Sequence, residues 1–535
     1  MGDDKKEPGS RIVWGLFFIM LLLHFFVALK WQERFFINFI TNSDCFTDAM
    51  SWAYQNIVRF DQGFSLLLDF RRIAVGAHWP PLVTIIGTLN LLLVPARFFF
   101  LPNFLYLAMT MLGIYHATRF LTGNRLYSMV AAVIFSCYWA TMIQLVAFEL
   151  QLAVAACLAW SFYWYLRSRF FTCFWPSLAA GLFMVLALYC DRVTPAVFAG
   201  ALFLVPENFK NKKAWGFMAV TMILVAVCAW PFYRNWVMTL ANLFAHPELM
   251  GQIGDVRPAP EVYREVLRNG WFLSAHLSYY FVSLTEKLLG YCFTALLVSG
   301  LFFLSRLRKP YAQVLWAAVL VPLIVFIAVL KKDHFYIFPL CVYFAIISGA
   351  GLCLIRTKWF RSLLLAVVTV LAITQSLLLF DFSARKTTPL FSHQFKRIKM
   401  QTVPRLFLDP YAEPPRNYLR QVYFVVNKVS SLMNRRAAEG DQEQALIVDL
   451  QGHYLQHVTV FLLRTRLQRA KVINAFYNVP PDSDESCLES SLYLLSNKTA
   501  YAGDRGPGSR GCSWKALELL GRLSESDVTL YRVLK

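Results

Sequence analysis

Two carboxylates stand four residues apart, at Asp44 and Asp48, shortly after the first strongly apolar run of the chain. Apolar residues recur behind them at helical spacing, namely Phe46, Ala49, Met50, Ala53, Ile57 and Phe60. This pattern predicts a helix lying on the membrane surface with acidic groups at its start. Asp44 could then act as a general base on an acceptor hydroxyl, with Asp48 as the second choice. The competing interpretation is that Asp44 caps the helix and Asp48 lies on its wet face.

Other polar residues occur where apolar segments meet water. His78 precedes Trp79 and a pair of prolines, which fix an extended approach to the next apolar segment. His78 could contact a lipid-linked phosphate, or the segment could simply anchor the chain at the interface. Glu149 lies near the outer end of a predicted span, where a carboxylate facing a cavity is a candidate functional group; otherwise it extends to the interface.

Two basic sites complete the set of candidates. Arg192 follows Asp191 at a predicted outer turn, where the two could form an internal ion pair or the arginine could contact a phosphate. Lys331 and Lys332 lie in a very short connection between apolar runs. One of them could hold an anionic headgroup, or both could extend their stems along the membrane edge.

The composition is that of a polytopic membrane protein. The 535 residues are 57% hydrophobic and only 16% charged, whereas soluble proteins carry about 25% charged residues. The net charge of +20 comes from short Lys and Arg clusters between apolar runs, which indicates membrane topology. We therefore expect no nucleic-acid partner.

The basic clusters decide the expected topology. The first apolar run continues into Lys30 and Arg34 and lacks the features of a cleaved signal peptide, so it predicts an uncleaved span. The segment 81–97 is short for a span that needs about 20 residues. If it does not cross, the basic clusters all face the cytoplasm, as the positive-inside rule favours. We therefore expect about eleven spans and an interfacial or re-entrant segment at 81–97. The expected spans are 12–30, 101–119, 126–143, 147–166, 173–190, 193–206, 214–233, 288–305, 312–330, 334–355 and 361–380.

The composition changes after Asp381. We predict a transmembrane domain over 1–381, a linker and helix over 382–443, and a small soluble α/β domain over 444–535. Within the last, 445–450, 471–476, 491–495 and 528–533 are predicted strands, and 454–468 is a predicted helix. Cys487 and Cys512 could form a disulfide in this domain if its compartment is oxidising.

Several short motifs follow one another in the order found in a known family. An acidic residue after the first span is followed by His78-Trp-Pro-Pro-Leu82, an inner turn Arg119-Phe-Leu-Thr-Gly-Asn-Arg125, the acidic Glu149, and Lys332 spaced before Tyr336 and Pro339. This layout over residues 12–380 resembles the GT-C membrane glycosyltransferases. Within them it is similar to protein O-mannosyltransferases and lipid A aminoarabinose transferases.

The resemblance implies a specific chemistry. A sugar carried on a polyprenyl phosphate would be transferred on the outer face to a lipid, glycan or protein acceptor. Asp44 matches the acidic residue of the family's first loop, with Asp48 as the fallback, and Glu149 matches its second outer acid. No nucleotide sugar is required, and no cofactor is expected, although the three acids could hold a divalent ion if folding brings them together. The implied location is the bacterial inner membrane, with a cytoplasmic N-terminus and a periplasmic C-terminal domain.

Two other function classes compete with this interpretation. A transporter or flippase for lipids or lipid-linked sugars would predict two halves with corresponding broken spans, and no internal repeat is visible in the sequence. A non-catalytic assembly partner would use the outer domain for binding. Long, asymmetric outer loops favour an enzyme over a transporter.

Overall fold

The structure is a computed structural model and describes part of the chain. The chain divides into two compact units. Unit 1 comprises residues 1–30, 74–83 and 100–411, and unit 2 comprises 31–73, 84–99 and 412–535. Each unit is described by itself below. The described residues are 10–42, 54, 81–95, 98, 100–146, 150–191, 194–245, 280–281, 283–289, 291–328, 334–380, 416–438, 444–449, 453–467, 470–474, 491–496, 516–522 and 529–534.

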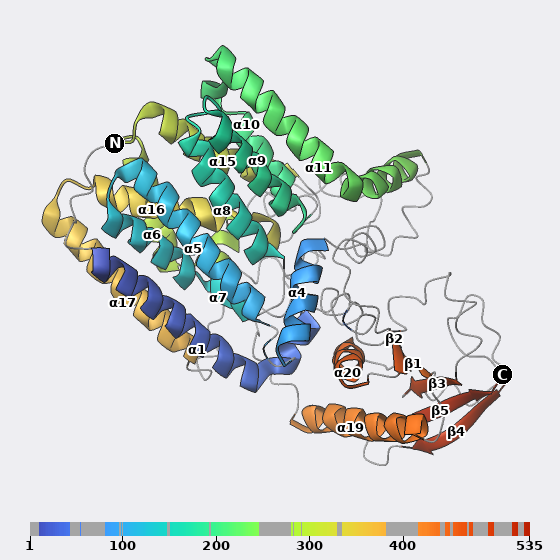
Figure 1. Ribbon diagram of the computed structural model, residues 1–535. Helices are drawn as coiled ribbons and strands as arrows, with labels where there is room; N and C mark the ends of the chain where they lie inside the picture. Colours follow the sequence, from blue (N-terminus) through green and yellow to red (C-terminus); the bar gives the residue numbers. More distant parts are fainter. Residues whose placement is uncertain are drawn as a thin grey trace, which may run out of the picture. The chain divides into compact units, whose positions relative to one another are not determined.

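Unit 1 is a bundle of apolar helices (Figure 1). Each of the expected spans coincides with helical residues, although the boundaries differ. The helices are α1 (Ser10–Asn42), α5 (Leu101–Thr122), α6 (Arg125–Cys137), α7 (Trp139–Val146), α8 (Gln151–Arg167), α9 (Phe174–Leu188), α10 (Thr194–Phe203), α11 (Lys212–Ala245), α14 (Tyr291–Leu304), α15 (Lys309–Ala328), α16 (Leu340–Leu354) and α17 (Lys358–Phe380). Short helical turns η2 (Pro206–Phe209), η4 (Leu284–Leu289) and η5 (His334–Ile337) lie between them.

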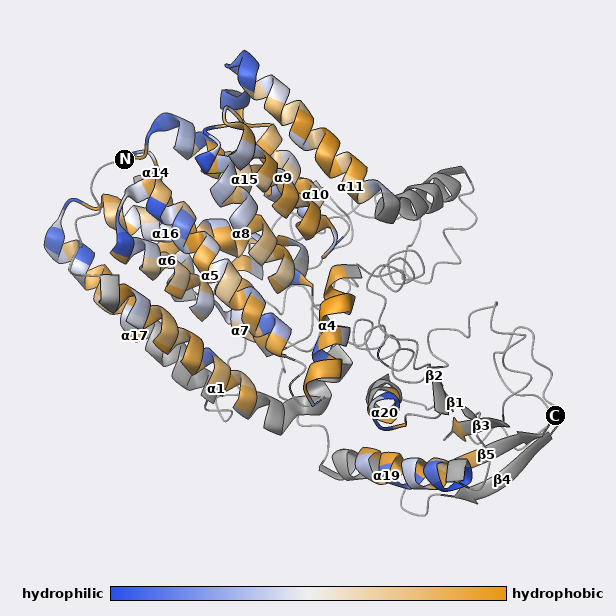
Figure 2. Ribbon diagram, viewed as in Figure 1, coloured by the Kyte–Doolittle hydropathy of each residue, from blue (hydrophilic) through white to orange (hydrophobic). Residues whose placement is uncertain are grey.

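Two of these helices are long and apolar enough to cross a membrane by themselves, over Lys212–Trp230 and Lys309–Ile327. Shorter apolar helices include Val13–Leu29, Phe174–Leu188 and Leu340–Leu354. Apolar residues dominate the visible side of α11, where Ile223 and Val227 are 62% and 65% exposed (Figure 2). An exposed apolar helix face of this kind is suited to contact with lipid.

The span predicted over 126–143 is not one continuous helix, because α6 ends at Cys137 and α7 begins at Trp139. Tyr138 leaves the helical conformation, with φ −62° and ψ 140°, and α7 begins at the next residue. The fully buried Tyr138 ring packs edge-to-face against Phe293 of α14, with the ring centroids 5.4 Å apart. Tertiary packing of a large ring thus accompanies a break for which the sequence holds no proline or glycine signal.

The segment expected to lie at the interface forms the short helix α4 (Pro81–Leu93). Thirteen residues extend about 20 Å, well short of a hydrocarbon core about 30 Å thick. Trp14 at the start of α1 contacts Tyr115 near the end of α5, at a ring distance of 5.7 Å, while Phe25 contacts Phe104 near the start of α5, at 5.6 Å. These contacts make α1 and α5 antiparallel. The expected topology requires this antiparallel arrangement of the two helices, and the number of spans stays a prediction.

The basic loops lie together at one end of unit 1, which we call the basic end: the turns at 119–125, 167–169, 210–213, 306–309 and 356–361. Ring contacts join Tyr311 to Phe120 and to Phe170, at 6.0 and 5.6 Å, and the Arg361 guanidinium lies 5.5 Å from the Tyr127 ring centroid. Figure 2 shows hydrophilic residues gathered at this end. The shared end agrees with the charge argument, and the side of the membrane that it faces stays a prediction.

The centre of the bundle is α16, which is buried along nearly its whole length. Gly349 and Gly351 bring its backbone against two neighbours. A Cβ atom on Gly349 would lie 2.5 Å from the Ala131 Cβ of α6, and one on Gly351 would lie 2.6 Å from the Gly300 Cα of α14. Small residues allow such backbone contact, which in a membrane replaces the missing hydrophobic driving force between helices.

Unit 2 contains a mixed five-stranded sheet in the order β2-β1-β3-β5-β4. β1 (Gln444–Asp449) pairs in parallel with β2 (Ala470–Asn474) and β3 (Ser491–Ser496), whereas β5 (Thr529–Leu534) is antiparallel to β3 and to β4 (Ala516–Arg522). The helices are α19 (Arg416–Ala438) and α20 (His453–Arg466). The predicted strands and the helix at 454–468 coincide with these elements, and β4 was missed. The predicted domain boundaries stay predictions.

The close approach at α16 gives a stability prediction. Gly349→Ala should destabilise the protein by about 1–3 kcal/mol, because the added methyl group overlaps Ala131. The matched control is Gly200→Ala on α10, where a Cβ meets nothing within 4 Å and should stabilise the helix by up to about 1 kcal/mol. Thermal unfolding in detergent measures both, and equal midpoints for the two variants would contradict the packing described here.

Candidate functional site

The residues predicted to carry the chemistry lie outside the described part of the chain. These are Asp44, Asp48, His78, Glu149, Arg192, Lys331 and Lys332. The structure therefore leaves their roles as predictions. Described residues that precede or follow several of these positions lie at one end of unit 1.

The flanking residues gather at the end of unit 1 opposite the basic loops. The Leu82 amide, at the start of α4, donates a hydrogen bond of 3.2 Å to the Tyr189 carbonyl at the end of α9. η4 contacts both α7 and η5. His78, Glu149, Arg192, Lys331 and Lys332 lie outside the described residues, so their position at this end stays a prediction.

Aromatic residues before and after Lys331 and Lys332 in the sequence make ring contacts within unit 1. Phe326, in the last turn of α15, stacks on Tyr336 of η5 with ring centroids 5.8 Å apart. Phe338, which follows η5, contacts Phe135 of α6 at 6.2 Å. The described residues on both sides of Lys331 and Lys332 are thus packed against rings of unit 1.

Buried amide side chains mark the same end, and sequence reasoning gave them no role. Asn103 of α5 is fully buried and donates from its Nδ2 atom to the carbonyls of Gln144 and Leu145, at 3.1 and 3.4 Å. These two carbonyls belong to the last turn of α7, where a helix has no partners of its own. Asn103 therefore caps α7 from a neighbouring helix.

Three further polar side chains lie beside this cap. Thr141 and Gln144 of α7 and Gln151 of α8 are all buried, at 7% exposure or less. The Thr141 hydroxyl, both amide atoms of Gln144 and the Gln151 Oε1 atom have no hydrogen-bond partner among the described residues. Leaving a buried polar group unpaired costs about 1–3 kcal/mol. Such groups call for a ligand, water or a nearby segment of the chain as partner, and residues 147–149, including Glu149, connect the two helices.

A signal for this polar cluster was present in the sequence. Asn103, Thr141, Gln144 and Gln151 interrupt runs that are otherwise apolar. Polar residues inside membrane segments are expensive and commonly functional. They lie on three helices, α5, α7 and α8, and the contact between Asn103 and the last turn of α7 depends on the fold.

Metal binding and the disulfide stay predictions. No group of three or more His, Cys, Asp or Glu side chains comes together in the described residues. The acids considered as ion ligands, Asp44, Asp48 and Glu149, lie outside those residues, as do Cys487 and Cys512.

Comparison with known proteins identifies the fold. A comparison with protein-family models finds no match, and neither does one with curated proteins. Among solved structures, ArnT from Cupriavidus metallidurans bound to undecaprenyl phosphate matches with a TM-score of 0.53 at 11% identity, covering 98% of each chain. The same protein in the apo state matches with a TM-score of 0.47 at 11% identity, covering 86% of this chain and 91% of the other.

The chain has the GT-C fold. The resemblance to GT-C membrane glycosyltransferases, and to lipid A aminoarabinose transferases among them, is confirmed at this level. The fold is that of an integral membrane protein. At 11% identity the likeness concerns the fold.

The Asn103 cap gives a prediction for the polar end. Asn103→Leu, which keeps the approximate size and removes the donor, should lower stability by about 1–3 kcal/mol because two buried carbonyls lose their partner. Thr110→Val is the matched control on α5, since the buried Thr110 hydroxyl bonds only the Tyr106 carbonyl of its own helix. Thermal unfolding in detergent should separate the two variants clearly. A loss of stability in Asn103→Leu no greater than the loss in Thr110→Val would show that the cap contributes little.

Proposed function

We propose that the chain is an integral membrane glycosyltransferase that moves a sugar from a polyprenyl-phosphate donor to an acceptor on the outer face. The observation that carries the proposal is the fold shared with ArnT, together with buried polar side chains on α7 and α8 that have no hydrogen-bond partner among the described residues. An apolar bundle with a polar end suits a substrate that joins a hydrocarbon tail to a sugar phosphate. The matching solved structure is of ArnT bound to undecaprenyl phosphate, which supports the donor class.

The proposed chemistry is a single displacement. Asp44 accepts the proton of the acceptor hydroxyl as its oxygen attacks the anomeric carbon of the donor sugar. The bond from that carbon to the phosphate oxygen breaks, and polyprenyl phosphate leaves with the bonding electron pair. The anomeric centre is inverted. Because no covalent sugar–enzyme intermediate forms, a second carboxylate is not needed as nucleophile.

The remaining predicted residues would serve the leaving group and the acceptor. His78, Arg192, Lys331 and Lys332 would stabilise the negative charge that develops on the departing phosphate. Glu149, with Gln144 and Gln151 beside it in the chain, would bind hydroxyl groups of the sugar or acceptor and so orient them. Acceptors that fit this chemistry are lipids, glycans or proteins carrying a free hydroxyl or amine.

The proposal places the molecule in a bacterial inner membrane. About eleven spans would place the N-terminus and the basic end in the cytoplasm. Residues 444–535 would form a periplasmic α/β domain after the segment 382–443, and the sheet of unit 2 supports this assignment. α4 would lie at the outer interface or re-enter the membrane without crossing.

One observation favours transport as a second candidate. The break at Tyr138 divides a span into α6 and α7, and discontinuous helices near a binding site are common in transporters. A lipid-linked sugar would then cross the membrane without being consumed. Donor consumption therefore separates the two functions, and movement of intact donor across proteoliposomes with no release of polyprenyl phosphate would favour transport.

The catalytic assignment is tested by Asp44→Asn. We expect transfer to fall by about 10²–10⁴-fold, the usual contribution of a general base. The readout is release of polyprenyl phosphate from a panel of polyprenyl-phosphate sugars, incubated with purified protein and a membrane extract as acceptor source. Asp61→Asn, in the same part of the chain, controls for loss of a negative charge. Full activity of Asp44→Asn would reject the assignment, and loss only in Asp48→Asn would transfer the role to Asp48.

The proposed orientation is tested by cysteine labelling. Lys213 at the basic end and Ser431 on α19 are both exposed, so cysteines introduced there are accessible to reagent. In intact cells a membrane-impermeant maleimide that passes the outer membrane should label Ser431→Cys above the wild-type background and leave Lys213→Cys unlabelled. Labelling of Lys213→Cys before lysis would show that the basic end faces the periplasm, which is the reverse of the proposed topology.

A further inference from the structure

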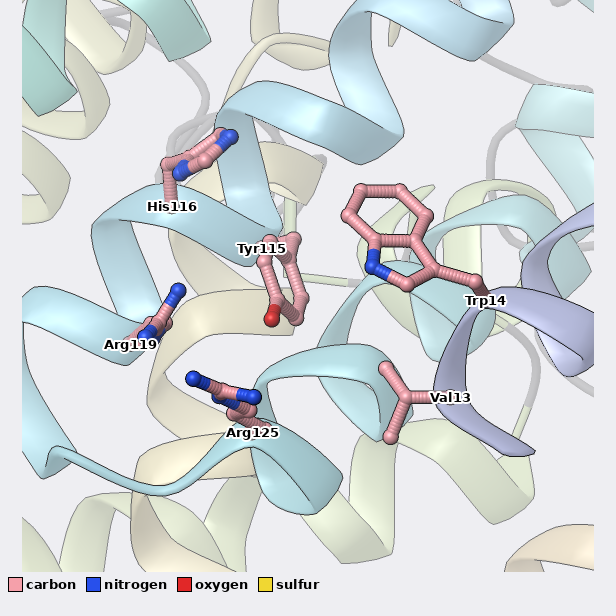
Figure 3. Close-up of a pocket in the computed structure, with 6 residues that line it drawn as sticks. All are labelled: Val13, Trp14, Tyr115, His116, Arg119 and Arg125. Carbon is pink, nitrogen blue, oxygen red and sulfur yellow. The ribbon is translucent and has the colours of Figure 1, made fainter. Parts of the chain in front are cut away.

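A pocket of about 210 Å³ lies at the basic end of unit 1, far along α5 from the polar cluster (Figure 3). Its described lining consists of Val13 and Trp14 of α1, Tyr115, His116 and Arg119 of α5, and Arg125 of α6. The volume corresponds to several water molecules at about 30 Å³ each, which is enough for a phosphate group and part of its ester. The proposed glycosyltransferase mechanism uses none of these residues.

Two guanidinium groups reach this pocket from the two sides of one tight turn (Figure 3). Gly123, between α5 and α6, has φ +71°, and its amide donates to the Arg119 carbonyl at 2.8 Å. Asn124 then caps α6 by accepting from the Tyr127 amide at 3.2 Å. The turn therefore fixes the backbone of Arg119 and Arg125, and both are partly buried.

The other lining side chains combine polar atoms with apolar ring faces. The Tyr115 hydroxyl points toward the two arginines in Figure 3. The Trp14 ring lies 5.7 Å from the Tyr115 ring and is 37% exposed, so it stands at the rim. On the far side the His116 ring contacts Trp160 and Tyr163, at 5.6 and 5.3 Å, which holds it in place. The site is thus a built pocket and not a patch of surface charge.

An apolar surface continues from the pocket along α1. Phe18, Ile19 and Leu22 follow Trp14 and are 65%, 62% and 56% exposed. A ligand whose phosphate occupied the pocket could therefore lay hydrocarbon chains along α1 toward the membrane centre. Arginine pairs suit phosphate oxygens, and basic pockets between membrane helices bind lipid headgroups.

We propose that this pocket binds the phosphate of an anionic phospholipid, drawn from the leaflet that the basic end faces. Arg119 and Arg125 hold the phosphate oxygens, Tyr115 donates a hydrogen bond, and α1 contacts the acyl chains. The site is separate from the proposed donor site at the opposite end of the bundle. Lipid binding alone tests this site, independently of whether the chain transfers sugars.

Native mass spectrometry of the detergent-solubilised full chain tests this proposal. The protein is titrated with phosphatidylglycerol or with phosphatidylcholine, which lacks net charge. We expect selective retention of phosphatidylglycerol, weakened about thirty-fold in Arg119→Gln/Arg125→Gln if each arginine contributes as basic residues near anionic lipid do. The matched control is Arg306→Gln/Arg308→Gln, which removes the same charge from exposed positions at the same end and should retain most of the binding.

Three outcomes would overturn the proposal. Equal losses in the two double variants would reduce the effect to general surface charge, and unchanged binding in Arg119→Gln/Arg125→Gln would place the lipid elsewhere. Competition by millimolar glycerol 3-phosphate as effective as the whole lipid would show a soluble phosphate ester as ligand, because α1 would then contribute nothing. Circular dichroism and thermal unfolding of each variant confirm that a loss of binding is not a loss of fold.

Discussion

Unpaired backbone carbonyls at helix ends inside a membrane are the constraint on which much of unit 1 depends. No water is present in the hydrocarbon to satisfy them, so each interruption of a helix needs a partner from elsewhere in the protein. Where α6 ends, the Nε2 atom of His24 on α1 lies 2.8 Å from the Ser136 carbonyl. Where α7 ends, Asn103 of α5 serves the Gln144 and Leu145 carbonyls. Asn103 thereby caps α7 after the break, and the His24 ring lies at the end of α6 before it.

The divided span allows one end of the bundle to be polar while its centre stays apolar. α16 occupies the centre and contacts α6 and α14 through Gly349 and Gly351 at backbone distance. The break at Tyr138 then permits α7 to follow its own direction and to present Thr141 and Gln144 to the interior. Thr141 and Gln144 keep side-chain atoms without a hydrogen-bond partner among the described residues, which supports the proposed site for a lipid-linked sugar. The basic end, with its separate pocket, meets a different chemical environment.

The sequence predicted those features of the fold that depend on hydrophobic runs and on charge. The helices of unit 1, the short α4 and the gathering of basic loops at one end all follow from apolar length and from the spacing of Lys and Arg. The break at Tyr138 could not be predicted, because it arises from packing against Phe293 and has no proline or glycine. β4 was missed for a related reason. Its residues Ala516–Arg522 include Ala, Leu and Glu, which favour helix, and pairing with β5 overrides that preference.

Predicting the site required a different kind of information. Motif order and acidity directed attention to Asp44, Glu149 and the lysines at 331 and 332, which are recognisable because charge is rare in this chain. The amides at Asn103, Gln144 and Gln151 carry no charge and lie on three different helices, so their meeting depends on the tertiary structure. Arg119 and Arg125 were interpreted as topology signals and as the ends of an inner-turn motif, and neither interpretation predicted that α1 lines a pocket with them.

The partners of the divided span also have an order along the chain. His24 and Asn103 both precede α7 in sequence, so they have been synthesised before the carbonyls they serve leave the ribosome. The antiparallel helices α1 and α5 can thus be in the membrane before the interrupted segment enters it. The polar backbone at the break can then be covered as soon as it is inserted.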